Sequence, residues 1–322
     1  MTSPATTAGN TTDATDAADA PAPAAAPGAV RLVGSVVRAG RPKQWAKNAL
    51  VVAAPGAAGV LGHRVVLERT ALAFAAFCLV ASGTYILNDV VDREADRRHP
   101  TKRHRPIASG AVSIPVAATV GVCVGAFGLA LAFIVGWKFA AVLGVYVGLT
   151  AGYNLGLKDI AVVDIAVVAS GFVMRAIAGG VAARVPISQW FLIVASFGSL
   201  FMVAGKRHGE HLELGDDRAS VRATLGDYPV SYLRYVWMIA SAVTMTAYCL
   251  LAFEQQHVKT SGGLPLYELT IVPFVLALLR YALLLETGHG SAPEDLVLGD
   301  RPLLVIGLVW VLSFGLAVYV GS

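Results

Sequence analysis

Four oxygen-bearing side chains lie at helical spacing directly after an apolar run: Asn88, Asp89, Asp92 and Asp96. Asp92 and Asp96 follow Asp89 by three and seven residues, so a continuing helix would carry all four on one face. Stacked carboxylates repel one another, whereas a hard divalent cation takes oxygen ligands and keeps waters that a phosphate can replace. The spacing predicts a Mg²⁺ site with these four residues as ligands. The alternative is a solvated helix end whose acids form weak ion pairs with the neighbouring arginines.

Cations follow the acids at once, with Lys102, Arg103, His104 and Arg105 ahead of Pro106. Proteins often bind phosphoryl groups with a carboxylate-held metal next to arginines. The metal binds phosphate oxygens, and the guanidinium groups donate further hydrogen bonds to them. We therefore expect Lys102 and Arg105 to contact a substrate phosphate. Membrane topology explains part of the same cluster, since basic residues gather in cytoplasmic loops.

The composition excludes an ordinary soluble domain. Of the 322 residues 56% are hydrophobic and 14% charged, and the mean hydropathy is +0.65, which predicts an all-α, polytopic membrane protein. The three cysteines each lie inside an apolar run, so we expect free thiols and neither a disulfide framework nor a zinc site. The net charge of +4 gives no indication of a nucleic-acid partner.

Nine apolar segments are long enough, or nearly so, to cross about 30 Å of hydrocarbon as helices. They lie near residues 47–62, 70–88, 112–135, 138–155, 161–182, 188–205, 232–252, 267–285 and 302–320. The first is the least regular, because Pro55 and Gly56 interrupt it. Residues 1–29 are mostly Ala, Pro, Thr, Gly and Asp, which predicts a disordered tail before a transmembrane domain at 30–322.

The basic residues predict the orientation. Most of them fall in the entry segment that contains Trp45, in the 92–111 loop and in the 206–228 loop, and few fall in the alternate loops. By the positive-inside rule the tail and the acidic motif face the cytoplasm, and the C-terminus faces outward. We therefore expect a multi-pass protein of the cell membrane with its site on the cytoplasmic side.

Further candidate residues lie in and after the short connection at 153–159, which contains Tyr153 and Lys158. Asp164 and Arg175 follow inside the next apolar run, where a charge is costly unless it faces a polar cavity or a partner. We predict that these four residues bind substrate. For Asp164, the alternative is a buried partner for Lys158 or Arg175.

The connection after the sixth segment begins with Lys206, Arg207 and His208. These side chains would meet a phosphate held at the Asp89 metal if the helices surround one cavity. In a solvated loop they would have no such role.

At NDVVDREAD the sequence resembles the UbiA superfamily of intramembrane prenyltransferases, whose first signature is Asn-Asp-x-x-Asp-x-x-x-Asp. Asn88, Asp89, Asp92 and Asp96 match it position for position. The segments RPKQWAKN, RPIASG and YNLGLK extend the resemblance from about Arg41 to the C-terminus. It implies about nine helices around a central cavity, with Mg²⁺ and a diphosphate bound by the acids.

One departure from the family's usual motifs indicates a particular branch of the superfamily. Typical members carry a second motif, Asp-x-x-Tyr-x-x-x-Asp, after the sixth helix, where this chain has GKRHGEH. Together with QWAKN, YNLGLKD and FVMRAIAGGVA, this is similar to a branch of the superfamily that transfers phosphoribose. That resemblance implies transfer of 5-phosphoribose from phosphoribosyl diphosphate to a polyprenyl (decaprenyl) phosphate, with release of diphosphate, on the pathway to cell-wall arabinan.

This chemistry suggests roles for the residues. The metal held by Asp89 and Asp92, with Arg105, would stabilise the charge that develops on the leaving diphosphate. Lys206 and Arg207, with Lys158, would hold the 5-phosphate.

Lys43 and Lys47, beside Trp45, would hold the lipid phosphate at the interface. That phosphate is already ionised at neutral pH, so no strong general base is needed.

Two alternatives remain at this stage. A prenyltransferase with an aromatic acceptor would share the first motif and the fold, but ought to have acids after the sixth helix. A transporter of an anionic solute would account for the buried Arg175 and Arg280. The sequence leaves open whether the chain forms a homo-oligomer.

Overall fold

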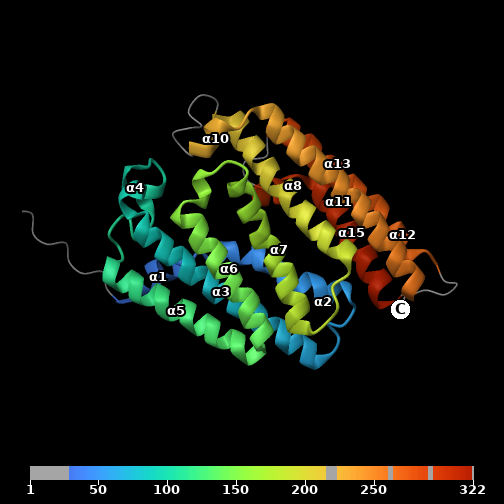
Figure 1. Cartoon of the computed structure of the whole chain (residues 1–322), viewed down its shortest axis with the longest axis horizontal. Coiled ribbons are helices and arrows are strands. Elements are labelled where there is room, and N and C mark those ends of the chain that lie inside the picture. Colours follow the sequence, from blue (N-terminus) through green and yellow to red (C-terminus); the bar gives the residue numbers. More distant parts are fainter. Residues whose placement is uncertain (1–28, 215–222, 260–263, 289–292, 321–322) are drawn as a thin grey trace, which may run out of the picture.

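The structure, a computed structural model, describes residues 29–214, 223–259, 264–288 and 293–320. Every regular element within these ranges is a helix, which confirms the predicted all-α class (Figure 1). The predicted tail at 1–29 lies almost entirely outside the described residues, so its disorder stays a prediction.

The long helices are α3 (Arg64–Val91), α5 (Ile114–Val135), α6 (Trp137–Leu155), α7 (Val163–Ala183), α8 (Gln189–Leu214), α11 (Val230–Lys259), α13 (Ile271–Glu286) and α15 (Arg301–Tyr319). The short elements are α1 (Ala29–Ala39), η1 (Pro42–Val52), α2 (Ala53–Ala57), α4 (Arg93–Arg98), η2 (Lys102–His104), η3 (Leu157–Asp159), α10 (Ala223–Asp227), α12 (Leu266–Leu269) and α14 (Pro293–Gly299). The long helices alternate in direction, so α4, η3 and α10 lie at one end of the bundle and the C-terminus at the other (Figure 1). We call the first of these the motif end.

Seven described helices are long and apolar enough to cross a membrane: α3, α5, α7, α8, α11, α15, and α12 with α13. They fall on seven of the nine predicted segments. The 138–155 segment also forms a helix, α6, but Lys138 and Asn154 near its two ends lower its mean hydropathy.

The first predicted segment, 47–62, is not one α-helix. Its place is taken by η1, an 11-residue 3₁₀ helix, followed by the five-residue α2. Because a 3₁₀ helix rises about 2.0 Å per residue against 1.5 Å in an α-helix, the two together extend roughly 30 Å. They run antiparallel to α3, with Trp45 Nε1 donating to Ser82 Oγ (3.0 Å) and Asn48 Nδ2 to Cys78 Sγ (3.3 Å). The predicted count of nine continuous helices is therefore not confirmed.

Close contact with α7 holds η1 in this extended form. A Cβ atom on Gly179 of α7 would lie 1.9 Å from the carbonyl oxygen of Val51, so only glycine permits the approach. Four residues earlier, Arg175 Nε donates to Asn48 Oδ1 (2.7 Å). The 3₁₀ segment is thus fixed by a steric fit and by a buried polar contact.

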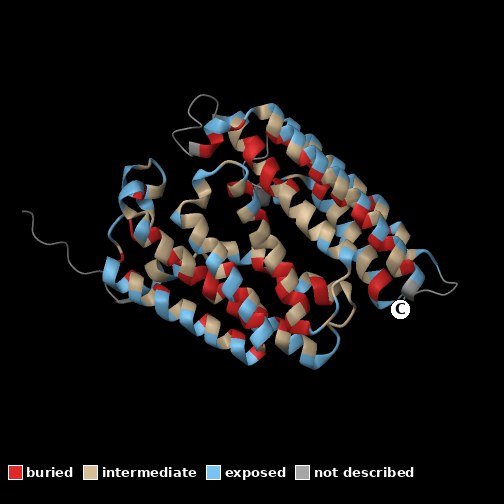
Figure 2. Ribbon diagram, in the orientation of Figure 1, coloured by how far each residue is buried: buried red, intermediate tan, exposed pale blue. Residues whose placement is uncertain are grey.

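Two of the buried clusters connect most of the long helices. Phe77, Phe139 and Tyr146 pack together where α3, α6 and α7 meet η1, and Phe201 and Trp237 lie in the second cluster, between α8, α11 and α13. Figure 2 shows buried residues along the inner helix faces and exposed residues along the outer ones. Many exposed side chains are large and apolar, Ile134 and Leu312 among them, as expected of helices that face hydrocarbon.

Arg280 is not buried as predicted: its side chain is 32% exposed and has a local partner. Its Nε and Nη2 atoms donate to the two carboxylate oxygens of Asp300 at 3.1 and 2.7 Å. Asp300 also caps α15 by accepting from the backbone N–H of Leu303 (2.8 Å). These hydrogen bonds from Arg280 lower the pKa of Asp300. Arg280 therefore joins α13 to the start of α15, and it no longer supports a transporter.

Candidate active site at the motif end

Asp89 is the centre of the first charge cluster. It lies on the last turns of α3 and is only 2% exposed. Its Oδ1 atom accepts hydrogen bonds from the guanidinium groups of Arg41 and Arg105, the latter at 3.1 Å. A carboxylate buried among apolar helices is costly unless it is paired, and two arginines provide the compensation here.

Asp96 reaches the same cluster from α4. The chain bends at Asp92, between α3 and α4, yet Asp96 remains buried and its Oδ2 atom accepts from Arg105 Nη1 at 2.7 Å. The same nitrogen therefore contacts both Asp89 and Asp96. The prediction that these two acids share one face agrees with this geometry, although the helix is not continuous.

Asn88 and Asp92 complete the motif. The side-chain oxygen of Asn88 is buried and has no hydrogen-bond partner among the described residues. The Asp92 carboxylate is half-buried and lies 3.8 Å from Lys158 Nζ of η3. A buried amide oxygen without a donor is a natural ligand for a cation, because an unsatisfied polar atom costs free energy.

The donor set fits Mg²⁺ as an open site. Mg²⁺ is commonly held by one or two carboxylates together with substrate phosphates and water, and Asp89 and Asp96 offer two converging carboxylates. Within the described ranges no three acidic, histidine or cysteine side chains form a closed metal cluster. The remaining ligands would therefore have to come from Asn88 and Asp92, from water and from a phosphorylated substrate.

A second cluster centres on Asp164, at the start of α7. Asp164 has no exposed surface, and its Oδ1 atom accepts from the Tyr228 hydroxyl at 2.6 Å. Arg207 Nε of α8 lies 3.5 Å from the other carboxylate oxygen, and Arg207 Nη1 donates to Glu210 at 2.8 Å. Arg207 is itself only 4% exposed. The cluster is a buried chain of alternating donors and carboxylates.

Tyr228 closes this cluster from the segment before α11. Its hydroxyl also accepts from the backbone N–H of Val162, a residue held at φ 71° at the start of α7. A β-branched residue at positive φ is strained. Burial, and then the hydrogen bond to Asp164, raise the pKa of Tyr228. The phenol therefore stays protonated and donates to the carboxylate.

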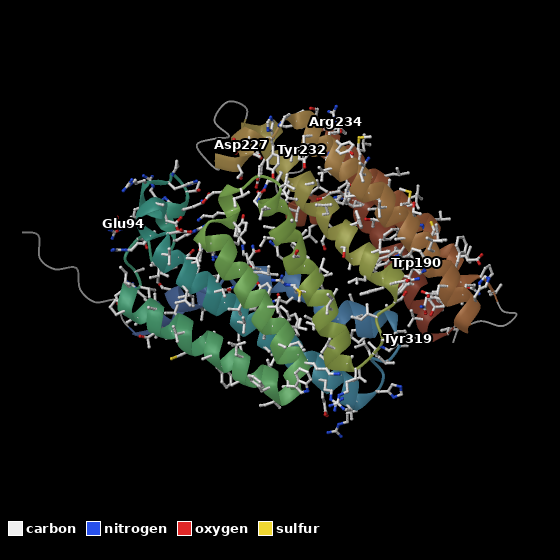
Figure 3. The ribbon with its side chains drawn as sticks, in the orientation of Figure 1. Glu94, Trp190, Asp227, Tyr232, Arg234 and Tyr319 are labelled. Atoms are coloured by element: carbon white, nitrogen blue, oxygen red, sulfur yellow. The ribbon has the colours of Figure 1, made fainter. Side chains whose placement is uncertain are left out.

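The two clusters lie at the same end of the bundle. Lys158 of η3 reaches Asp92 with its ammonium group, and its carbonyl oxygen accepts from Thr224 Oγ1 of α10 at 3.5 Å. Figure 3 labels Glu94 of α4 and Asp227 of α10 at this end, with Trp190 and Tyr319 toward the opposite one. The α6–α7 connection thus links the acidic motif to the second cluster.

The other predicted residues have different surroundings. Lys206 is 40% exposed in its side chain and lies 3.8 Å from Glu210. His208 is fully buried with its ring against Trp237 (6.1 Å between centroids), and its two nitrogens have no hydrogen-bond partner in the described part of the chain. Because Arg207 contacts α7 while His208 contacts α11, a joint role in phosphate binding is not supported by the geometry.

Arg175 lies further along α7 and belongs to neither of the two clusters. Besides Asn48, it donates to the carbonyl of Gly171 (2.6 Å) and to the Tyr146 hydroxyl (3.1 Å), and its guanidinium lies 4.8 Å from the centre of the Tyr146 ring. The predicted substrate contact is untested, but these neutral partners already satisfy three of its donors.

The remaining predicted residues lie on η1, η2 and α6. Lys43 is exposed and Lys47 half-buried on η1, Lys102 is half-buried on η2, and Tyr153 of α6 interacts electrostatically with Arg207.

Arg41, Tyr228 and Glu210 are site residues that the sequence analysis did not single out. Arg41 is 48 residues away from Asp89 and takes a left-handed conformation (φ 52°) before Pro42. Tyr228 lies 64 residues from Asp164. The one local signal was the Arg41–Pro42 pair at the start of η1. It was not decisive, because a basic residue at a membrane border also has a topogenic explanation.

The fold and the site together define a polytopic helical membrane protein with an acid-and-arginine cluster at one end. A family model described as the UbiA prenyltransferase family matches residues 49–298. The chain belongs to this family.

Individual proteins agree with this assignment. The chain is 45% identical over 294 residues to the decaprenyl-phosphate phosphoribosyltransferase of Corynebacterium glutamicum, covering 90% of this chain and 88% of that protein. It is 45% identical over 295 residues to the enzyme of the same name from Mycobacterium tuberculosis, covering 90% and 96%. Among solved structures, a UbiA homologue from Archaeoglobus fulgidus bound to GPP and Mg²⁺ matches with a TM-score of 0.66 and 18% identity, over 88% of this chain and 99% of that one. This last likeness concerns the fold.

Proposed function

We propose that the protein transfers 5-phosphoribose from phosphoribosyl diphosphate to a polyprenyl phosphate, with decaprenyl phosphate as the acceptor. The observation that carries the proposal is the composition of the second cluster. Where typical family members place a second set of metal-binding acids, this chain has Lys206, Arg207 and Glu210 beside Asp164. The 45% identity to two enzymes of that name supports it.

The first cluster is the site proposed for the diphosphate of the donor. Asn88, Asp89, Asp92 and Asp96 are the residues that would hold Mg²⁺, which when bound neutralises diphosphate charge and stabilises it as a leaving group. Arg41 and Arg105 touch Asp89 already, and their remaining N–H groups are available for phosphate oxygens. As the bond from C1 to the diphosphate breaks, these guanidinium groups stabilise the departing negative charge.

The second cluster is the site proposed for the 5-phosphate. Lys206 is the more exposed of its two cations, and we assign it the direct contact. Arg207 is almost fully buried between Asp164 and Glu210, so we assign it the task of holding this cluster together. A phosphate bound by cations needs no second metal, and the two acids of this cluster, Asp164 and Glu210, already pair with Arg207.

The acceptor is a phosphate monoester, and its ionised oxygen forms the new bond to C1 as diphosphate leaves. This nucleophile needs no strong base to remove a proton. Lys43 and Lys47 on η1 are the residues proposed to hold the lipid phosphate. They follow Arg41 by two and six residues, so they place the acceptor next to the first cluster.

The test is turnover by the purified protein. Labelled phosphoribosyl diphosphate, decaprenyl phosphate and Mg²⁺ should give a labelled lipid, and a prenyl diphosphate with an aromatic acid should give no product. Prenylation of the aromatic acid, without labelled lipid, would instead assign the chain to aromatic-acceptor prenyl transfer.

Replacing Lys206 with Ala should raise the KM for phosphoribosyl diphosphate about tenfold to a hundredfold, which corresponds to a lost charge-assisted hydrogen bond of about 1.5 to 3 kcal/mol. The contact exists in the substrate and in the transition state alike, so kcat should change little. The KM for the lipid should be unchanged. Steady-state kinetics with each substrate varied in turn provide the measurement, and Glu213→Ala, about two turns further along α8, is the control. A rise in the lipid KM alone would place the acceptor phosphate at Lys206.

The motif end is proposed to face the cytoplasm, because it carries most of the loop Lys and Arg residues. In a Cys123→Ser and Cys249→Ser background, a cysteine at Thr101 should react with an impermeant thiol reagent only after cells are opened. A cysteine at Ser322 should react in intact cells. The reverse pattern would contradict both the orientation and a cytoplasmic sugar phosphate as donor.

A further inference from the structure

Helix α1 has one covered and one uncovered apolar face. Leu32, Val36 and Ala39 pack on a buried cluster formed by α3, α5 and the loop between them. Val30, Val33 and Val37 are 88%, 62% and 55% exposed. At 3.6 residues per turn these three valines fall within roughly 60° of one another, so they form one apolar stripe along α1.

A stripe of positive charge runs beside the valines. Arg31 and Arg38 are seven residues apart and both exposed, so they share one line along the helix, within roughly 20°. Lys43 continues this charge onto η1 and is exposed as well. The sequence has no Asp or Glu from Ala29 to Leu67, so no neighbour in that segment neutralises these cations.

The position of α1 is at the border of the spanning region. α1 leads directly into Arg41, which contacts Asp89 where α3 ends. Trp45, partly exposed on η1, donates from its indole to Ser82 of α3. Tryptophan and arginine are enriched where hydrocarbon meets headgroups, so α1 lies at the depth of the lipid phosphates on the motif end.

We propose that α1 is a docking surface for anionic lipid headgroups. The valine stripe lies in the outer acyl region, and Arg31 and Arg38 bind the headgroup phosphates. Charge complementarity favours anionic lipids as the occupant. A zwitterionic headgroup carries its own cation, which competes with the arginines for the headgroup phosphate. The surface does not depend on the proposed reaction, and it places a lipid-bound helix two residues before Arg41.

The test reads lipid contact directly. The full chain, carrying Cys123→Ser, Cys249→Ser and Val33→Cys, is labelled at position 33 with an environment-sensitive fluorophore and placed in lipid nanodiscs. Spin-labelled phosphatidylglycerol should quench this label more strongly than spin-labelled phosphatidylcholine at equal content. High salt should reduce the difference, because screening weakens the attraction.

Paired variants identify the cations responsible. Arg31→Gln with Arg38→Gln should lower the preference for the anionic lipid by about tenfold or more, since each basic residue near an anionic surface contributes about a fivefold factor. Arg64→Gln with Lys138→Gln removes the same charge at the opposite end and should leave the preference intact. Equal quenching by both lipids in the unsubstituted helix, or equal effects of the two variant pairs, would overturn the proposal. A label shielded from both quenchers, as under a second copy of the chain, would overturn it too.

Discussion

Replacing Asp89 with Asn should lower kcat by at least about a hundredfold, the largest effect expected of any substitution in this chain. The carboxylate is proposed to hold a cation that stabilises the leaving diphosphate, a contribution of several kcal/mol. It also anchors Arg41 and Arg105. Because that charge develops only as the bond breaks, the loss should appear in kcat and not in the donor KM.

The control for Asp89 is Glu94→Gln. Glu94 lies on α4 in the same acidic stretch, but its side chain is 66% exposed and pairs only with Arg93 and Arg97 among the described residues. Figure 3 labels it on the outside of the motif end. This variant should keep full activity, and excess EDTA should abolish the activity of the unsubstituted protein. An Asp89→Asn enzyme that stayed fully active with Mg²⁺ would contradict the metal assignment.

Replacing Arg207 with Ala should destabilise the protein by about 3 to 5 kcal/mol. Asp164 is fully buried and accepts from the Tyr228 hydroxyl, and removal of its cationic partner leaves a buried charge without its counterion. Lys206→Ala at the neighbouring position is the matched control, and it should cost under about 1 kcal/mol because its ion pair is partly exposed and long, at 3.8 Å. Thermal unfolding in detergent should show a large drop in Tm for the first variant and little change for the second.

A double substitution tests whether Arg207 and Asp164 interact directly. Arg207→Met combined with Asp164→Asn removes both charges and should recover much of the stability lost by Arg207→Met alone. Strictly additive losses would show that Arg207 and Asp164 do not interact.

The local spacing of the acidic motif predicted a large part of the first cluster. The spacings within the motif are three, four and seven residues, between Asn88, Asp89, Asp92 and Asp96. A helix places residues at these spacings on one face. The bend at Asp92 was not predictable, since it depends on how α4 packs against the loop after it, where Arg97 Nε donates to the carbonyl of Ala108 at 3.0 Å.

Contacts between residues far apart in the sequence explain the other features that the sequence did not predict. Arg41 and Tyr228 reach carboxylates that are 48 and 64 residues away, and no periodicity encodes such pairs. The 3₁₀ form of η1 depends on Gly179 of α7, which is likewise distant in the sequence. His208 was grouped with Arg207 because the two are adjacent, but successive residues on a helix point about 100° apart, which directs His208 to Trp237.

The most direct test of the proposed function is a stoichiometric one. Purified protein is incubated with phosphoribosyl diphosphate labelled in the ribose, decaprenyl phosphate and Mg²⁺, and the labelled lipid and the released diphosphate are counted together. One diphosphate released for each labelled lipid formed, with neither product when the lipid phosphate is left out, is the predicted result. Diphosphate release without a labelled lipid, or turnover of a prenyl diphosphate in place of the sugar donor, would contradict it.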